Sequence, residues 1–403
     1  MVETTIRAVP AATPTLTNTI YINPLAKQLS DAYKDGFSIE STSQRTFLEI
    51  LGLLGMGRKS QKVQVRDLKF HPMPAREEVE EAFKDNTALQ LAARDSIKND
   101  TRIFVEYEGR PIMLRATAIP SFLDRLRISG DVLSVIPKEM LAKHLNDYAQ
   151  FTSGTALLIE NNGKGEALLG QKYKLTPAEE IMDEAAQFFQ GADFEKGLYS
   201  HSFVSATWRL GETKVQIPFD EDGNDLVFDQ TVTVSTSDNG RKAISVVPMM
   251  QLKGDSMGLS YCLPLRMEHN GKSGIEEFHK MLELIDKRFD DTSLFIKQLL
   301  DIDLQYPANV LLAMFKFLKI PGKYGASVYE NKKIMWSVQT HTAYEVYSAL
   351  SEVLSLILGE SQSEQSLAEY RERFSRALKF DFEAYDLPGD YGYNDRFIGQ
   401  KAV

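Results

Sequence analysis

Residues 113–175, MLRATAIPSFLDRLRISGDVLSVIPKEMLAKHLNDYAQFTSGTALLIENNGKGEALLGQKYKL, contain two helix patterns followed by a pattern of paired strands. The first helix is predicted around Phe122, Leu123 and Leu126, because these residues fall on one face of a helix. A second helix is predicted after Pro137, from the similar spacing of Met140, Leu141, Leu145 and Tyr148. Helices and strands therefore follow one another within one short part of the chain.

The strands of this stretch are predicted as a hairpin. Two apolar runs, 155–160 and 166–170, flank the turn signal Asn162-Gly163. Residues 176–179, Thr-Pro-Ala-Glu, then predict the start of a third helix. The threonine would cap it, the proline would occupy its first position, and the glutamate follows three residues after the cap. The stretch indicates a fold class and contains no catalytic motif.

The flanking sequence extends the same mixture of elements. Upstream patterns predict a helix over 44–56, a basic strand over 58–66, a helix over 77–93 and strands over 103–107 and 111–114. Downstream patterns predict strands over 202–210 and 214–218 around Gly211-Glu212, strands over 230–235 and 242–247, and helices from 273 onward, including 310–318 and 341–358.

These patterns together predict an α+β protein, with hairpins and a mixed or antiparallel sheet in the first half and middle, and a helical C-terminal half. Residues 20–358 would form a single body, strand-rich to about 250 and helical from about 273. Residues 1–19, rich in Thr, Ala and Pro, predict a flexible arm. Residues 359–403 predict a polar helix followed by an acidic-aromatic tail.

Composition excludes several classes of protein. The 403 residues include one cysteine, which rules out an internal disulfide and a Cys-rich zinc site. No apolar stretch reaches the roughly 20 residues that span a bilayer, so we expect a protein of the host-cell cytoplasm or of a virion, without a membrane partner. The net charge of -10 argues against a protein whose whole surface binds nucleic acid, although a local basic groove is compatible with it.

Basic residues are concentrated in the first half of the chain, and two parts of it, between Ile50 and Arg66 and between Gly109 and Leu123, contain no acid. Such a distribution would suit a groove along a single strand, with Tyr107, Phe122 or Tyr173 stacking on bases. The alternative is a charged edge strand and scattered solvated side chains. The candidate nucleic-acid-binding residues are Arg58, Lys59, Lys62, Arg66, Arg110, Arg115, Arg125, Arg127, Lys172 and Lys174, with Lys164 in the same region.

The C-terminal tail contains aromatic residues among acids, without periodicity. One interpretation is an ordered tail whose aromatic residues pack on the body. The other is a mobile tail that covers the basic groove or docks a partner. The candidate partner-binding residues are Phe380, Phe382, Tyr385, Tyr391 and Tyr393.

Motifs for catalysis or for a cofactor are not recognisable. The six histidines show no metal-ligand spacing, and there is no Gly-x-Ser-x-Gly motif. Cys262 lies in an apolar run, which favours a buried small side chain over a nucleophile. We therefore predict no cofactor and favour a protein that is not an enzyme, while carboxylates that converge in space leave an enzyme open.

Six short segments between residues 113 and 356 carry a resemblance through their order along the chain: Phe122-Leu123 with Leu126; Pro137 with Leu145-Asn146; Ala167–Tyr173; Thr236–Gly240; Glu268–Gly271; and Thr342–Glu352. In this order they resemble a family of phage- and plasmid-encoded proteins of unknown function. Gly170 replaces a usual serine, and Tyr261-Cys262-Leu263 shortens another of the family's segments. The resemblance implies a mobile-element origin and identifies no catalytic residues.

Three functions fit these observations. We predict a DNA-binding accessory protein of phage or plasmid replication or recombination, with single- or double-stranded DNA as its partner. One alternative is an effector that binds a host or phage protein, such as an inhibitor of a host defence system, which the net acidity favours. The other is a virion or scaffold protein that assembles as a homo-oligomer.

Overall fold

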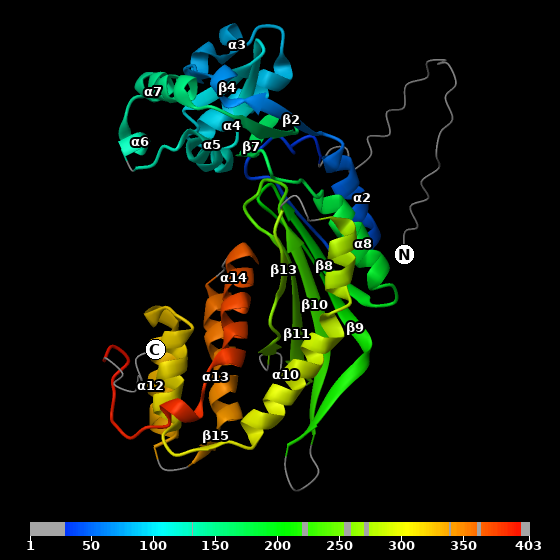
Figure 1. Ribbon diagram of the computed structural model, residues 1–403, viewed down its shortest axis with the longest axis vertical. Coiled ribbons are helices and arrows are strands. Elements are labelled where there is room, and N and C mark those ends of the chain that lie inside the picture. The colour runs from blue at the N-terminus through cyan, green and yellow to red at the C-terminus, as the bar shows by residue number, and fades with distance from the viewer. Residues whose placement is uncertain are drawn as a thin grey trace.

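The structure, a computed structural model, describes residues 29–395 except 131, 220–224, 254–258, 270–273, 338–339 and 361–363. The predicted arm, residues 1–19, lies outside the described residues. Two large sheets, one of six strands and one of seven, are combined with helices along the whole described chain (Figure 1). This confirms the predicted α+β class.

The six-stranded sheet has the strand order β2-β6-β7-β5-β4-β3. All neighbouring pairs are antiparallel except β5 and β7, which run parallel at Met113–Lys164 and Leu114–Gly165. Its strands are β2 (Arg58–Gln64), β3 (Lys69–Pro72), β4 (Ile103–Tyr107), β5 (Arg110–Leu114), β6 (Thr155–Asn161) and β7 (Lys164–Gly170).

Two separate clusters of apolar side chains join this sheet to its helices. The larger group includes Phe122 and Leu145 with residues of all six strands, and the smaller includes Val79 and Ala93 with Met113. The helices are α3 (Val79–Ala82), α4 (Thr87–Lys98), α5 (Ile119–Leu126), α6 (Val132–Val135) and α7 (Lys138–Phe151). The predicted helix over 77–93 is in fact two, because Asp85 adopts a left-handed backbone (φ 62°) that separates α3 from α4.

The seven-stranded sheet is antiparallel, with β13 pairing β11 beside the main order β1-β8-β9-β10-β11-β12. Apolar and polar residues alternate along β10, as expected for a strand with one face on a core. The strands are β1 (Ser38–Ser41), β8 (Asp193–Ser200), β9 (Phe203–Pro218), β10 (Asp225–Thr236), β11 (Ile244–Leu252), β12 (Leu259–Tyr261) and β13 (Leu265–Met267).

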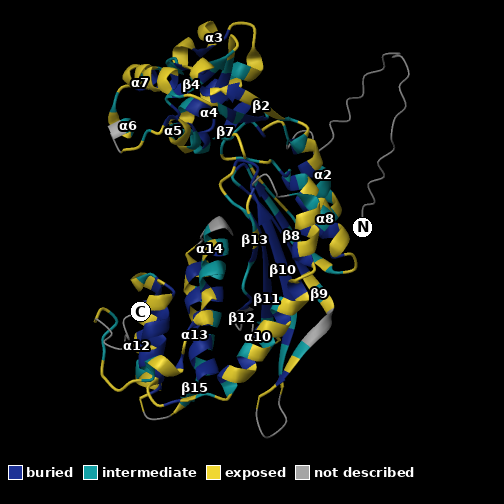
Figure 2. Cartoon of the chain, in the orientation of Figure 1, coloured by how far each residue is buried: buried dark blue, intermediate teal, exposed yellow. Residues whose placement is uncertain are grey.

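One hydrophobic core joins this sheet to the remaining helices (Figure 2). The helices are α2 (Gln44–Gly55), α8 (Ala178–Phe188), α9 (Ile275–Leu282), α10 (Ile285–Leu300), α11 (Pro307–Phe317), α12 (Gly322–Met335), α13 (Ala343–Gly359) and α14 (Glu364–Ser375), with the small pair β14 (Asp303–Leu304) and β15 (His341–Thr342). The single body predicted for residues 20–358 thus contains two sheets with separate hydrophobic cores.

The six-stranded sheet is inserted into the seven-stranded one along the sequence. β1 pairs with β8, and every strand of the six-stranded sheet lies between them in the chain. The two ends of the insertion approach each other, because Arg58 at the start of β2 donates to Glu179 Oε1 at 2.9 Å in α8, the helix that follows β7. The polar connection between the two cores forms where the chain enters and leaves the insertion.

Two further local predictions are wrong. The turn expected at Gly211-Glu212 is absent, since β9 continues through it; the register against β10 shifts there, from Leu210–Gln230 to Val215–Phe228. The cap expected from Thr176 is also absent: α8 begins at Ala178, whose amide donates to Asp238 Oδ1 at 2.9 Å. A carboxylate distant in sequence therefore replaces the local hydroxyl at this helix terminus.

Candidate functional site

Two of the predicted nucleic-acid-binding arginines, Arg58 and Arg115, lie in the interior. The Arg58 guanidinium donates to Glu179 Oε1 at 2.9 Å and to Asp238 Oδ2 at 2.5 Å, and its side chain is 9% exposed. The Arg115 side chain is 1% exposed and donates to Glu166 Oε1 at 3.2 Å. The prediction of phosphate contacts is therefore wrong for both residues, because carboxylates from other parts of the chain already neutralise them.

Arg115 belongs to a buried charge cluster at the junction between the two cores, which comprises Asp35, Asp95, Arg115, Lys164, Glu166 and His201. The Lys164 ammonium is fully buried and lies 2.8 Å from Asp35 Oδ1 and 2.6 Å from Asp95 Oδ2. Arg115 also donates to the main-chain oxygens of Ala32 and Tyr33. Opposite charges therefore fix the inserted sheet against the segment that precedes β1.

The pKa values of His201 and Glu166 in this cluster are both lowered, for different reasons. Burial lowers the pKa of His201 below its ordinary value, and the adjacent Glu166 opposes this shift only in part. Burial opposes ionisation of Glu166, but the hydrogen bond with His201 and the charge of Arg115 lower its pKa below the ordinary value. At the nearby helix cap, burial raises the pKa of Asp238 to about 7, against the charge of Arg58. Interactions within the protein account for these shifts, so the cluster is a structural connection.

The other predicted basic residues differ in their freedom to bind a ligand. Arg110 forms a two-point ion pair with Glu160, with both distances 2.6 Å. Arg66 Nε lies 3.8 Å from Asp67 Oδ1, and 67% of the Arg66 side chain is exposed. The remaining six predicted residues are all exposed: Lys59, Lys62, Arg125, Arg127, Lys172 and Lys174.

The strongest candidate site is a polar pocket of about 460 Å³ between the end of α5 and the loop after α7, called here the α5–α7 pocket. Arg125 and Arg127 line it, and the side chain of neither makes an ion pair or hydrogen bond with a described residue. Phe151 also lines it and is 87% exposed. The remaining lining residues are Val65, Asp124, Thr152, Ser153, Gly154 and Thr155.

The helix α7 ends at Phe151 in this pocket, and Figure 2 shows much of α7 coloured as exposed. Met140, His144, Tyr148 and Phe151 follow one another at helical spacing, and all four are exposed. Tyr148 is 50% exposed and Met140 is 47% exposed, whereas Leu141 and Leu145 point into the core. The apolar residues of α7 therefore divide between two faces, which their shared helical spacing did not reveal.

The aromatic residues predicted to stack on bases are not the ones that the structure exposes. Phe122 is 1% exposed in the core, and Tyr173 stacks on His269 with ring centroids 5.2 Å apart. Tyr107 is half-buried. Phe151 and Tyr148 were missed as candidates; the signal for Phe151 was its position at the end of a helix, just before a Thr-Ser-Gly loop.

The C-terminal tail packs on the helical half of the protein. Phe380 and Phe382 are buried, and Tyr385, Tyr391 and Tyr393 are half-buried against the same core. Asp386 accepts hydrogen bonds from the amides of Gln305 and Tyr306 at 2.9 and 2.6 Å. Figure 1 shows this segment beside α12, away from the six-stranded sheet. The tail up to residue 395 is therefore ordered, and its buried phenylalanines cannot dock a partner in this structure.

Other chemical groups give no candidate centre. Within the described ranges, no three His, Cys, Asp or Glu side chains are grouped as metal ligands. Cys262 is buried, as predicted, and burial raises the pKa of its thiol to about 12. No helix in the described part of the chain has the length and apolar character needed to cross a membrane.

Comparisons with known proteins do not identify the chain. No protein family, curated protein or solved structure matches it. The resemblance to phage- and plasmid-encoded proteins stays a prediction, and the geometry of the α5–α7 pocket is the main guide to function.

Proposed function

We propose that the protein binds single-stranded nucleic acid at the α5–α7 pocket, as an accessory protein of phage or plasmid replication or recombination. The observation that carries the proposal is the position of two unpaired arginines, Arg125 and Arg127, beside the exposed ring of Phe151. Proteins that bind single strands without sequence preference combine basic side chains for the phosphates with aromatic side chains for the bases. The mobile-element origin rests on the resemblance of residues 113–356 alone.

The surroundings of the pocket suit a phosphodiester chain. Arg66 follows Val65, a lining residue whose amide donates to Gly154 O at 3.2 Å, so a third basic side chain is close to the loop. Asp124 is the one acid among the lining residues. Along α7, Tyr148 offers a second exposed ring three residues before Phe151. This local surface is compatible with a net charge of -10 because affinity depends on the charges near the phosphates.

The affinity should depend on salt and on strandedness. Each phosphate contact on a single strand contributes about 0.7 to the slope of log affinity against log salt. Loss of one stacked base costs about 1–3 kcal/mol, and a duplex keeps its bases inside the helix. We therefore expect a labelled oligothymidine to bind more tightly than a duplex of equal length, with affinity falling as salt rises.

Variants of the full-length protein test the assignment. Arg125→Gln with Arg127→Gln should weaken binding at low salt and reduce the salt slope by about 1.4. Phe151→Ala should weaken binding by about 1–3 kcal/mol and leave the salt slope unchanged, because it removes stacking and no charge. Fluorescence anisotropy across a salt series measures both quantities.

Matched controls are an exposed lysine on α10 and an exposed phenylalanine just after β9. Lys287→Gln and Phe219→Ala change similar groups away from the pocket and should leave binding unchanged. Equal effects of control and pocket variants, or no salt-sensitive binding by the wild type, would exclude the proposal. The exposed α7 face would then be assigned to a protein partner, the alternative function that the sequence leaves open.

A further inference from the structure

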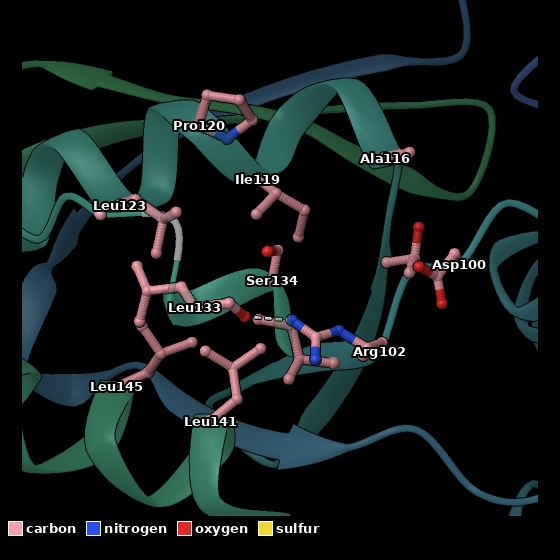
Figure 3. Close-up of a pocket in the computed structure, with 13 residues that line it drawn as sticks. Asp100, Arg102, Ala116, Ile119, Pro120, Leu123, Leu133, Ser134, Leu141 and Leu145 are labelled. Carbon is pink, nitrogen blue, oxygen red and sulfur yellow. Dashed lines mark hydrogen bonds between the residues drawn. The ribbon is translucent and has the colours of Figure 1, made fainter. Parts of the chain in front are cut away.

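A second cavity, of about 400 Å³, lies inside the inserted part, where α5, α6 and α7 meet the connection between α4 and β4 (Figure 3). Ile119, Leu123, Leu141 and Leu145 supply an apolar wall. Figure 3 shows Arg102 and Asp100 on the side of the cavity away from Leu123. The volume is in the range of small-molecule sites, which combine apolar walls with a few polar groups.

Arg102 places a positive charge at this cavity, and no carboxylate among the described residues forms an ion pair with it. Its guanidinium donates to the main-chain oxygens of Ile136, at 2.6 Å, and Leu133. Two bonds to neutral carbonyls leave further N–H groups of the fork available. A half-buried cation beside an apolar wall is costly unless an anion accompanies it. The positive charge therefore points to an anionic ligand group.

Thr101 supplies a second, independent observation. It lines the cavity and is 3% exposed, yet its hydroxyl Oγ1 has no hydrogen-bond partner in the described structure. A buried hydroxyl without a partner costs about 1–3 kcal/mol relative to a satisfied one. A ligand oxygen held by Arg102 would satisfy the neighbouring hydroxyl. The exposed carboxylate of Asp100, at the same end, would repel that oxygen through solvent.

We propose that this cavity binds a small amphipathic carboxylate, with its apolar body against Leu123, Leu141 and Leu145 and its carboxylate at Arg102 and Thr101. Charge complementarity selects an anion, and the apolar wall selects a hydrocarbon or aromatic body. The site is separate from the α5–α7 pocket and does not depend on nucleic-acid binding.

The test compares octanoate with octan-1-ol, which has the same chain length and no charge, by isothermal titration calorimetry on the full-length protein. The wild type should bind octanoate saturably, one per chain, about tenfold or more tightly than octan-1-ol, since hydrogen bonds to charged groups contribute more than neutral ones. Arg102→Met should remove this preference, and Arg102→Lys should keep part of it. Asp100→Asn should tighten octanoate binding.

Thr101→Val keeps the shape of the side chain and removes only an unpartnered hydroxyl. It should leave the midpoint of thermal unfolding unchanged or raised, yet weaken octanoate binding several-fold. Leu123→Trp should fill the cavity and abolish binding of both compounds. Lys98→Met, an exposed change in the last turn of α4, is the control and should change nothing.

Three results would overturn the proposal. The first is no saturable octanoate binding by the wild type at millimolar concentration. The second is an unchanged preference for octanoate in both Arg102→Met and Thr101→Val. The third is full binding by Leu123→Trp, which would place the bound molecule elsewhere. None of these measurements involves nucleic acid. Failure of the carboxylate-binding proposal would therefore leave the proposal of nucleic-acid binding at the α5–α7 pocket untouched.

Discussion

Replacement of Lys164 by methionine tests the charge cluster between the two cores. The Lys164 side chain is 0% exposed, and its ammonium lies within 2.8 Å of Asp35 and 2.6 Å of Asp95. Asp35 would keep Arg115 and the Ala116 amide as partners, whereas Asp95 would lose its ion pair. Removal of one partner from a buried pair costs about 3–5 kcal/mol, because the remaining charge is left uncompensated in a poorly solvated place.

An exposed pair in the same region provides the matched control. Lys34 lies 2.7 Å from Asp31, and the two side chains are 44% and 53% exposed. Solvent screens such a pair, so Lys34→Met should change the free energy of unfolding by about 0–1 kcal/mol. The similar ion-pair distances make burial the main difference between the two variants.

The effect of Lys164→Met should depend on pH. Burial opposes ionisation of Asp95, but the hydrogen bonds from Lys164 and the Asp35 amide, together with the charges of Lys164 and Arg115, outweigh it and lower the pKa of Asp95 below its ordinary value of 3.8. A lowered folded-state pKa contributes stability that is present above the unfolded value and is lost as pH falls through the folded value. The difference between wild type and variant should therefore narrow below about pH 3.8.

Urea unfolding at several pH values measures these quantities. Both tryptophans, Trp208 and Trp336, belong to the core of the seven-stranded sheet, so their fluorescence reports that core, while circular dichroism reports the whole chain. A loss of less than about 1 kcal/mol in Lys164→Met at pH 7, equal to that of the exposed control, would refute the reasoning.

Three further substitutions test packing and edge contacts by the same measurement. Asn146→Ala should cost about 1–3 kcal/mol, because its amide bonds both the N–H and the C=O of Phe70 at 2.7 Å on the edge strand β3. Phe382→Ala should cost about 3–5 kcal/mol, as expected for a buried ring, whereas a mobile tail would cost nothing. Gly197→Ala should cost about 1–3 kcal/mol, because the added methyl group would meet the buried ring of Phe47.

Local elements were predictable from the sequence where one pattern determined them. The helix α7, Lys138–Phe151, follows the spacing of Leu141 and Leu145 after Pro137. The predicted range 341–358 corresponds to the helix α13, Ala343–Gly359. The helix ends one residue later than predicted and begins after its cap, Thr342. Each depends on contacts between residues three or four apart, which a sequence displays directly.

The partners of the basic residues were not predictable in the same way. The stretch around Arg58 contains no acid in sequence, yet Glu179 and Asp238 meet it in space. Arg115 meets Glu166 by the same long-range folding. A count of charges along the sequence shows excess positive charge at positions where the folded protein forms neutral ion pairs. Residues such as Arg125 and Arg127, which line the α5–α7 pocket, keep the unpaired side chains that the prediction requires.

The predicted turn at Gly211-Glu212 failed for a related reason. Glycine beside a polar residue fits a hairpin, and it also fits an irregular place within a long strand. The pairing of β9 with β10 on both sides of the irregularity determines which occurs, and that pairing involves residues up to Pro218 and Asp225. The structure of the tail could not be predicted because its aromatic residues are not spaced at a helix or strand period. Each of them nevertheless packs into or against the hydrophobic core.

The nesting of one sheet within the other has a consequence during synthesis of the chain. β1 leaves the ribosome early, but its partner β8 begins only at Asp193, after the last strand of the inserted sheet has ended at Gly170. All partners of the inserted sheet's strands are therefore available while β1 is still unpaired. β1 has the sequence Ser-Ile-Glu-Ser, short and polar, which limits wrong pairing with other chains during that delay.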